Sequence, residues 1–413
     1  MRASVALLPL VLSAVPLFSQ QSLIRGDDGR RLDSLMRAAE SRGFHGNVLV
    51  ARGGEPLLLA GYGIANHATG ARFTPATLVQ IGSNVKDFTA TAIHQLAERG
   101  QLRITDSLHR YFDSLPADKR VITIGHLLDH RAGLPLGVAL DQEPLSRDEM
   151  LRRLRALKLS AQPGAREAYS NLGYSLLAAI VERVAGRPFE AYLAERVFAP
   201  AGMKETGLAL PAFDPARVAH GYAGGVDRGT VLDLPRDPDG HLWSLRGNGG
   251  MLATLGDMHR FYRALRGPAL VRDAEHRRAV LPLDEPGLWA GSDRVSYFAY
   301  ASFPRPGLEI LLASNHQEYS GQRVIRELEA ALGAARDRRV GRAADAHDGA
   351  RARAAAPDPL DPGRSGLLGG PVPILTFGIS SGSVGGDASG ACHDARRPRA
   401  EARYPHVPGR PRP

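Results

Sequence analysis

Cysteine is almost absent from this sequence of 413 residues, in which Cys392 is the single example. One cysteine can build neither a disulfide framework nor a cysteine-based zinc site. The composition is otherwise ordinary, with 43% hydrophobic and 23% charged residues. These values exclude global disorder and collagen-like repeats. The sequence therefore predicts a globular protein, long enough for one large domain or two to three smaller ones.

Lysine is nearly as scarce. The 52 basic residues are arginines except for Lys86, Lys119, Lys158 and Lys204. The formal net charge is +9, but residues 336–413 carry +5 of it. Because the rest of the chain is close to balanced, the charge argues against a nucleic acid as partner. Each lysine is of interest, since lysine can act as a base once deprotonated and arginine cannot.

Long apolar runs are missing beyond the first twenty residues. The chain begins MRASVALLPLVLSAVPLFSQ, a short positive start followed by an apolar run and a polar end. This pattern is typical of a secretory signal peptide, and the run is short for a membrane-spanning anchor. No cysteine follows it, which disfavours a lipoprotein. We expect residues 1–22 to be a signal peptide and the mature protein to be periplasmic or secreted, without a stable membrane anchor.

Apolar periodicity places strands near both ends of the chain and helices between them. Two apolar runs flank Gly53-Gly54, which indicates a hairpin, and two more occupy 295–303 and 307–315. Segments with helical spacing include 27–43, 83–100, 171–186, 257–265 and 319–332. This order predicts an α/β (α+β) fold. Its antiparallel sheet is built from both chain ends and has flanking helices, with an all-α subdomain inserted at about 83–240.

The texture of the sequence changes near residue 335. Ala, Arg, Gly, Pro and Asp dominate residues 335–413, and helical periodicity vanishes. This composition predicts a disordered appendage, and an out-of-frame extension is the alternative. The folded domain is therefore expected at residues 23–334.

Ser83 and Lys86 are three residues apart at the start of a predicted helix, which puts both side chains on one face. A neutral lysine amine can accept the serine proton, and burial and the helix dipole both lower a lysine pKa. A serine activated in this way attacks carbonyl groups, with its own N–H available to the oxyanion. The alternative is a helix cap beside a solvated lysine, although a cation in the first turn opposes the dipole.

Tyr169 and Asn171 form the second candidate group, just before and at the start of another predicted helix. In an extended segment, residues two apart face the same way, so both side chains can face one cleft. A tyrosine hydroxyl can relay protons, and an asparagine amide can bind a substrate carbonyl or orient a lysine. The alternative is that Asn171 caps the helix and Tyr169 packs behind it.

Together, Ser-x-x-Lys at Ser83 and Tyr-x-Asn at Tyr169 resemble the motifs of the serine β-lactamase-like superfamily. The branch it resembles comprises class C β-lactamases, DD-peptidases and family VIII-type esterases. The resemblance extends over roughly residues 44–332 and includes ITIGHLLDHRAGLP and GNGGMLATLGDMHRFYRAL. It implies an antiparallel sheet with flanking helices and an all-α subdomain. It also implies that Ser83 is the acylated nucleophile, Lys86 the base and Tyr169 the second proton-transfer group, with no metal or organic cofactor.

Trp289-Ala290-Gly291 matches best the family's third element, Lys-Thr-Gly or His-x-Gly on the strand that lines the cleft. In the family the cation helps to hold a substrate carboxylate, whereas an indole offers an apolar wall. The difference favours neutral ester substrates. By the same resemblance, Ser292 places the second oxyanion N–H. The alternative is that Trp289 is an ordinary core residue.

Two other motifs give weaker evidence of function. Residues 378–382 match G-x-S-x-G, but no helical segment follows Ser380, as an α/β-hydrolase would need. His130 and the other histidines lack the spacing of metal ligands and are predicted to be structural.

We therefore expect an exported serine hydrolase that forms an acyl-enzyme on Ser83, with Asn171 helping to bind the substrate. Small neutral esters are the favoured substrates. The alternatives are a D-alanyl-D-alanine carboxypeptidase or class C-like β-lactamase acting on peptidoglycan-like substrates, and a non-catalytic binding protein on the same fold.

Overall fold

The computed structural model describes residues 21–332, except for 209–210, 293–295, 305–306 and 317–320. The predictions of a signal peptide, of a disordered tail and of no role for the G-x-S-x-G match concern residues that lie almost entirely outside these ranges. Within them, no helix has the length and apolar composition that crossing a bilayer requires.

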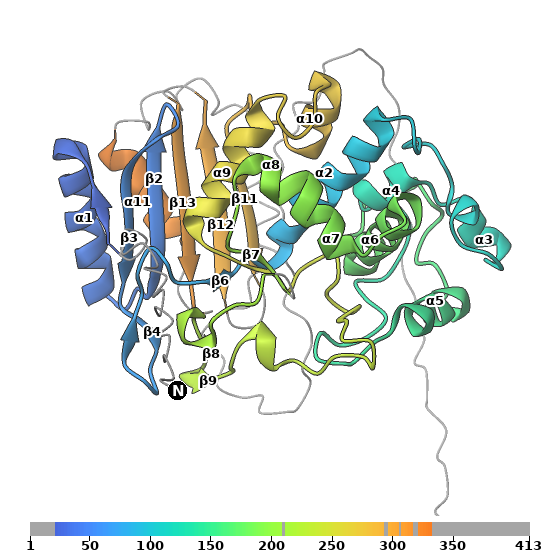
Figure 1. The fold of residues 1–413 in the computed structure, drawn as a ribbon, viewed down its shortest axis with the longest axis horizontal. Coiled ribbons are helices and arrows are strands. Elements are labelled where there is room, and N and C mark those ends of the chain that lie inside the picture. The colour runs from blue at the N-terminus through green and yellow to red at the C-terminus, as the bar shows by residue number, and fades with distance from the viewer. Residues whose placement is uncertain (1–20, 209–210, 293–295, 305–306, 317–320, 333–413) are drawn as a thin grey trace, which may run out of the picture. The chain divides into compact units, whose positions relative to one another are not determined.

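A six-stranded antiparallel sheet is built from both ends of the described chain (Figure 1). Its strands, in spatial order, are β1 (Leu23–Ile24), β3 (Glu55–Tyr62), β2 (Gly46–Arg52), β13 (Leu308–Ser314), β12 (Tyr297–Phe303) and β11 (Gly287–Ser292). The hairpin between β2 and β3 turns at Gly53 and Gly54, which have φ values of +59° and +80°. Late strand β13 pairs with early strand β2, with Leu311 opposite Leu49. The predicted fold class is confirmed.

Two helices cover one face of this sheet. They are α1 (Gly26–Ser41) and α11 (Gly321–Ala331), and Figure 1 shows both on its left-hand side. Leu32 and Met36 of α1 and Leu328 of α11 pack against strand residues such as Val48 and Ile310, and all five are buried. Side chains alternate between the faces of a strand, so the neighbours of these strand residues point to the other side.

The opposite face carries α9 (Leu255–Arg266) and, beyond it, the helical part of the molecule (Figure 1). The other α-helices there are α2 (Val85–Glu98), α3 (Ala117–Arg120), α4 (Ile124–Leu128), α5 (Arg147–Ala156), α6 (Asn171–Ala185), α7 (Phe189–Leu193), α8 (Ala199–Ala201) and α10 (Ala274–Val280). Short 3₁₀ turns occur at Gly82–Asn84, Leu108–Arg110, Pro215–Arg217 and Val231–Asp233, and a π-helical turn at Ala194–Phe198. The first of these elements is the turn that contains Ser83.

Between Ala201 and residue 240 the described residues form two 3₁₀ turns and no α-helix. Small sheets follow instead. A three-stranded sheet joins β6 (Val79–Gln80), β10 (Leu252–Ala253) and β7 (Thr206–Gly207), and two-stranded sheets pair β4 (Ile64–Asn66) with β5 (Ala71–Arg72) and β8 (Tyr222–Ala223) with β9 (Val226–Asp227). Gly224 and Gly225, both with positive φ, form the turn between β8 and β9. The last of the preceding α-helices, α8, ends where Gly202 takes a left-handed conformation, with φ at +72°.

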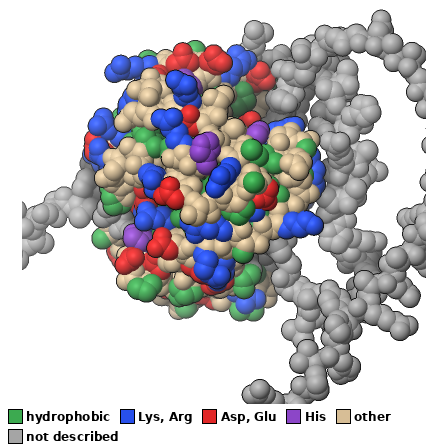
Figure 2. Space-filling view, turned by 90° about the vertical axis from the view of Figure 1, so that its right-hand side faces the viewer, with side chains coloured by type: hydrophobic (Ala, Val, Ile, Leu, Met, Phe, Trp, Pro, Cys, Tyr) green, Lys and Arg blue, Asp and Glu red, His purple; other side chains and the backbone are tan. Residues whose placement is uncertain are grey.

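The helical side of the molecule carries charges of both signs. Figure 2, which looks onto the right-hand side of Figure 1, shows Lys and Arg side chains interspersed with Asp and Glu. Charges of opposite sign also pair on α5, as in Arg152 with Glu149 at 2.6 Å. Mixed charge of this kind does not single out a polyanion as partner.

Candidate active site

Ser83 lies where the helical part meets the edge of the sheet. It sits in the 3₁₀ turn Gly82–Asn84, directly before α2, and its side chain is buried. Lys86, in the first turn of α2, donates a hydrogen bond from Nζ to Ser83 Oγ at 3.0 Å. The Tyr169 hydroxyl oxygen lies 2.7 Å from the same Oγ. The structure therefore brings together three predicted site residues from two distant motifs.

Lys86 is buried, with 6% of the residue exposed. Its Nζ also donates to the carbonyl oxygen of Asn248 at 2.7 Å. Burial lowers the pKa of Lys86 to about 7, while the carboxylates of Asp87 and Asp141 act in the opposite direction. Near neutral pH a large share of the amines is then deprotonated, the state in which a lysine can accept a proton from serine.

Tyr169 stands two residues before the start of α6, and the residue after it caps the helix. Ser170, not Asn171, is the N-cap: its Oγ accepts from the amide of Gly173 at 3.1 Å. Asn171 is the first helical residue, and its amide donates to Leu136 O at 2.7 Å. The Oδ1 atom of Asn171 is buried and has no hydrogen-bond partner among the described residues. The substrate-binding role of Asn171 stays a prediction.

Strand β11 passes very close to Ser83. A Cβ atom on Gly291 would lie 2.5 Å from the backbone nitrogen of Ser83 and 2.7 Å from Asn84 Oδ1, so only glycine fits there. A Cβ on Gly82, where φ is +50°, would lie 3.2 Å from the backbone nitrogen of Ser292. The two amides predicted to bind an oxyanion thus belong to adjacent segments.

Trp289 is on the same strand face as Gly291, but its indole does not form an open wall. Only 4% of the residue is exposed, and the ring stacks on Tyr300 at 5.7 Å between centroids. It folds back over Gly287, where a Cβ would lie 2.2 Å from the ring. Tyr300 stacks in turn on Tyr262 at 3.7 Å. In this structure the indole is part of a packed aromatic layer and does not form the expected apolar wall of the cleft. This agrees with the alternative that Trp289 is a core residue.

A polar group behind Ser83 was not predicted from the sequence. Asn84 Nδ2 donates to the hydroxyl of Tyr262 at 3.1 Å, and that hydroxyl donates to Asp87 Oδ2 at 3.1 Å. Burial raises the pKa of Asp87 to about 7. Asn84 lies inside the Ser83–Lys86 motif and Asp87 directly follows it, but Tyr262 is far away in the chain and has no signal of its own.

His130, predicted to be an ordinary structural histidine, lies against Tyr169. The two rings are 4.4 Å apart, and His130 Nδ1 accepts the amide of Ser170 at 3.1 Å. Burial, aided by the charge of Lys86, lowers the pKa of His130 to about 3. The spacing of His130 in the sequence gave no signal of this contact.

Other side chains could offer ligands to a metal. The nitrogens of His45, His67 and His316 lie within 4.8 Å of one another. His45 Nδ1, however, accepts the amide of Ile64 at 2.8 Å, which commits the lone pair of the neutral ring. A second group joins Asp237, Asp239 and His241, where Asp237 already accepts the amide of His241 at 2.6 Å.

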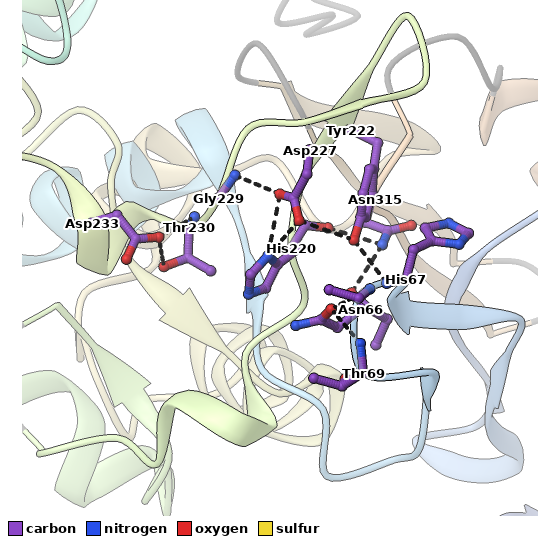
Figure 3. A network of polar contacts seen from close by, with 12 residues as sticks. Asn66, His67, Thr69, His220, Tyr222, Asp227, Gly229, Thr230, Asp233 and Asn315 are labelled. Carbon is purple, nitrogen blue, oxygen red and sulfur yellow. Dashed lines mark hydrogen bonds and ion pairs between the residues drawn. The ribbon is translucent and has the colours of Figure 1, made fainter.

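The surroundings of His67 form a joint between loops (Figure 3). The amide of His67 donates to the hydroxyl of Tyr222 at 2.9 Å, and Asn315 Nδ2 donates to the carbonyl of His220 at 2.9 Å. The same Nδ2 lies 3.2 Å from the carbonyl oxygen of Ile64. These bonds tie β4, β8 and the end of β13 together.

Comparison with known proteins agrees with this architecture. The Beta-lactamase family model matches residues 32–308. The putative penicillin-binding protein PbpX of Bacillus subtilis is 29% identical over 287 residues, which are 68% of this chain and 70% of that protein. Esterase EstB of Burkholderia gladioli is 30% identical over 292 residues, covering 60% of this chain and 74% of the esterase. Other curated relatives match over 42% to 57% of their own length.

A solved structure shows the same fold. The penicillin-binding protein from Bacillus halodurans superimposes with a TM-score of 0.57 at 27% identity, covering 73% of this chain and 99% of that one. The chain belongs to the Beta-lactamase family, a fold family of serine hydrolases that includes esterases, DD-peptidases and β-lactamases. The family and the enzyme class predicted from the sequence are confirmed.

Proposed function

We propose that this protein is an esterase that forms an acyl-enzyme on Ser83. The observation that carries the proposal is the pair of contacts at Ser83 Oγ, 3.0 Å from Lys86 Nζ and 2.7 Å from the Tyr169 hydroxyl. A binding protein needs neither a buried lysine nor a tyrosine hydroxyl directed at one serine oxygen. Such a constellation fits nucleophilic catalysis.

The proposed reaction runs in two halves. The neutral amine of Lys86 takes the Ser83 proton, Oγ attacks the ester carbonyl, and the amides of Ser83 and Ser292 hold the oxyanion. When the tetrahedral intermediate collapses, the proton returns to the leaving alcohol by way of Tyr169. Water then attacks the acyl-enzyme, with Lys86 and Tyr169 taking its proton and returning it to Ser83 Oγ. Asn171, at the start of α6, helps to bind the substrate.

The preference for neutral esters rests on the charges around Lys86. Position 289 carries an indole where the family's cation would bind a carboxylate, and that indole stacks on Tyr300. The carboxylate of Asp141, and that of Asp87 in its ionised form, add negative charge near Lys86. An anionic substrate gains little from such a site, whereas a neutral ester is not repelled. The similarity to esterase EstB supports the same substrate class.

A D-alanyl-D-alanine carboxypeptidase is the second candidate. It is favoured by relatives named penicillin-binding protein and putative D-alanyl-D-alanine carboxypeptidase, the latter 25% identical over 249 residues. Its substrate would be a peptidoglycan-like peptide ending in a carboxylate. A class C-like β-lactamase would form the same kind of acyl-enzyme by opening the amide of a β-lactam ring instead of cleaving a peptide.

We also propose that the protein is exported to the periplasm or secreted. The apolar run within residues 1–22 supports this. Expression of the full chain in a Gram-negative host, followed by fractionation and intact mass, tests it: loss of about the first 22 residues is expected for the exported form. A full-length protein retained in the cytoplasm contradicts export.

One set of assays tests the activity. Chain 23–413 is offered a short-chain aryl ester, a chromogenic cephalosporin and a D-Ala-D-Ala peptide, while intact mass records acylation during turnover. The ester should be the fastest substrate, and Ser83→Ala should lose several orders of magnitude in rate. Ser380→Ala, in the G-x-S-x-G match, serves as control and should retain the wild-type rate. If none of the three is turned over and Ser83 is not acylated, the proposal is contradicted. If the peptide is the fastest substrate, the protein is a carboxypeptidase, and if the cephalosporin is the fastest, it is a β-lactamase.

A further inference from the structure

His130 occupies an unusual position at the end of α4. The amide of Arg131 donates to the carbonyl of His126 at 2.8 Å, and the amide of His130 to that of Leu127 at 3.3 Å, which is a Schellman ending. The residue after the C-cap of such an ending takes a left-handed conformation, which glycine or asparagine usually supplies. Here it is a histidine, with φ at +55°. Stability of the helix end alone does not call for this side chain.

The left-handed backbone directs two acceptors of His130 at the segment that carries Tyr169. The carbonyl of His130 accepts the amide of Ala168 at 2.7 Å, and its Nδ1 accepts the amide of Ser170 at 3.1 Å. The residues before and after Tyr169 are thus both bonded to one histidine. The imidazole also lies against the Tyr169 ring, 4.4 Å away. We call this arrangement the His130 clamp.

We propose that His130 is a positioning residue that holds the Tyr169 hydroxyl at Ser83 Oγ. This inference rests on the proposed acyl-enzyme chemistry and extends it to a residue that does not touch Ser83. With backbone bonds on either side and a ring against it, Tyr169 has little freedom to leave the 2.7 Å contact. Preorganisation of this kind lowers a barrier without any new contact to substrate.

The clamp requires a neutral imidazole, since a protonated Nδ1 cannot accept the Ser170 amide. Burial and the nearby Lys86 charge hold the pKa of His130 at about 3, so the clamp stays closed where Lys86 titrates. The rings of Tyr169 and Tyr174 also face His130, the latter at 5.2 Å. Lys86 itself is faced by these two tyrosines, by His130, and by the carboxylates of Asp87 and Asp141.

Two substitutions separate clamping from folding. His130→Gly and His130→Asn both suit a left-handed backbone, but only asparagine offers a side-chain acceptor near the place of Nδ1. Ser114→Gly is the matched control, because Ser114 is exposed and is the other non-glycine residue with positive φ in the described part of the chain. Ester turnover, phosphonylation of Ser83 by a fluorophosphonate followed by intact mass, and melting temperature are measured for all three in chain 23–413.

We expect His130→Gly to lower kcat at least tenfold with KM within about threefold, because Tyr169 acts on the chemical step. His130→Asn should recover kcat to within about threefold of wild type, and Ser114→Gly should match wild type. In His130→Gly, water that enters beside Lys86 should move the acidic limb of the pH profile upward. Wild-type kcat in His130→Gly, an unmoved acidic limb, or equal losses in the glycine and asparagine variants overturns the inference.

Hydrogen exchange of the segment 166–172 gives a readout that does not depend on turnover. Exchange should be faster in His130→Gly than in wild type and should slow again in His130→Asn. If the wild-type protein is never acylated but the exchange follows this order, the proposed function fails and the clamp stands. If exchange is the same in all variants, the clamp fails even in an active enzyme.

Discussion

The two faces of the six-stranded sheet are packed in different ways. Against α1 and α11 the buried layer is largely aliphatic, with Leu32, Leu328 and Ile310 at its centre. Against α9 the layer holds polar groups: the hydroxyl of Tyr300 donates to Glu309 at 2.7 Å and accepts from Arg266 at 3.0 Å. Buried polar groups cost free energy unless they are paired. The polar groups on the second face are paired with one another, and these hydrogen bonds hold them in fixed orientations.

The difference indicates which face of the sheet orients the residues of the site. The polar layer continues from Tyr300 through Tyr262 to Asn84, within the Ser83–Lys86 motif, and to Asp87, which directly follows it. The aliphatic layer is on the far side of the sheet from these residues. We infer that the aliphatic face mainly stabilises the fold and that the polar face mainly orients the site. Substitutions on the two faces should therefore separate stability from activity.

The largest effect is expected from Lys86→Met, which should lower kcat/KM by about 10²–10⁴, the usual contribution of a general base. Because burial lowers the pKa of Lys86 to about 7, wild-type activity should rise with pH through that value as the amine loses its proton. A pH profile of ester hydrolysis measures both effects.

Lys86→Met should also change the pH dependence of stability. A lysine whose pKa is depressed by folding binds fewer protons when folded, so it makes the wild-type protein more stable as pH rises from about 7 toward its ordinary value of 10.5. The variant should lose this slope and unfold no more easily at pH 7. Melting temperatures across that range measure it, with Lys204→Met on a loop as control. An active or strongly destabilised Lys86→Met protein would contradict the division between the faces.

Gly291→Ala comes next. The added methyl would fall 2.5 Å from the Ser83 nitrogen, forcing β11, which carries the Ser292 amide, away from the Ser83 amide. Loss of one oxyanion donor costs about 10²–10³ in kcat. Steady-state kinetics on the ester check this, and Gly70→Ala, on an open turn with nothing within 4 Å, is the control. Equal kcat in Gly291→Ala and wild type would show that this strand does not set the oxyanion geometry.

Leu32→Ala tests the aliphatic face. Truncation of a fully buried leucine destabilises by about 2–5 kcal/mol. Activity per folded molecule should stay near wild type, since α1 lies across the sheet from Ser83. Urea unfolding gives the first quantity, and active-site titration with a fluorophosphonate gives the second. A large drop in kcat at low temperature, with the fold intact, would break the comparison.

Local sequence reasoning could predict the parts of the site that are close together in the chain. The three-residue spacing of Ser83 and Lys86 fixes their geometry on one helical turn, and Tyr169 was found because its motif resembles a known family. The carbonyl of Asn248 and the hydroxyl of Tyr262 reach the site only through tertiary packing, which no spacing encodes.

Trp289 shows the same limit from the other side. Only the family resemblance placed Trp289-Ala290-Gly291 on a strand that lines the cleft, and the structure has strand β11 there, with Gly291 beside Ser83. The direction of the indole depends on Tyr300, which lies opposite it on β12. The sequence around Trp289 alone cannot predict a side-chain rotamer that is set by a residue on the neighbouring strand.

The smallest effect is expected from Tyr262→Phe, which sharpens the comparison within the polar face. The ring keeps its 3.7 Å stack on Tyr300, but Asn84 and Asp87 each lose a hydrogen bond to the hydroxyl. A loss of about 1 kcal/mol in stability is expected.

The loss of the Tyr262 bond, which favours the Asp87 carboxylate, should raise the pKa of Asp87 further. A neutral Asp87 no longer favours the ammonium form of Lys86, so the acidic limb of the pH profile should move down. Tyr111→Phe, whose hydroxyl bonds Asp106 away from Ser83, is the matched control and should lose stability without moving the limb. A limb that moves in both variants, or in neither, would show that the polar face stabilises the fold without tuning the site.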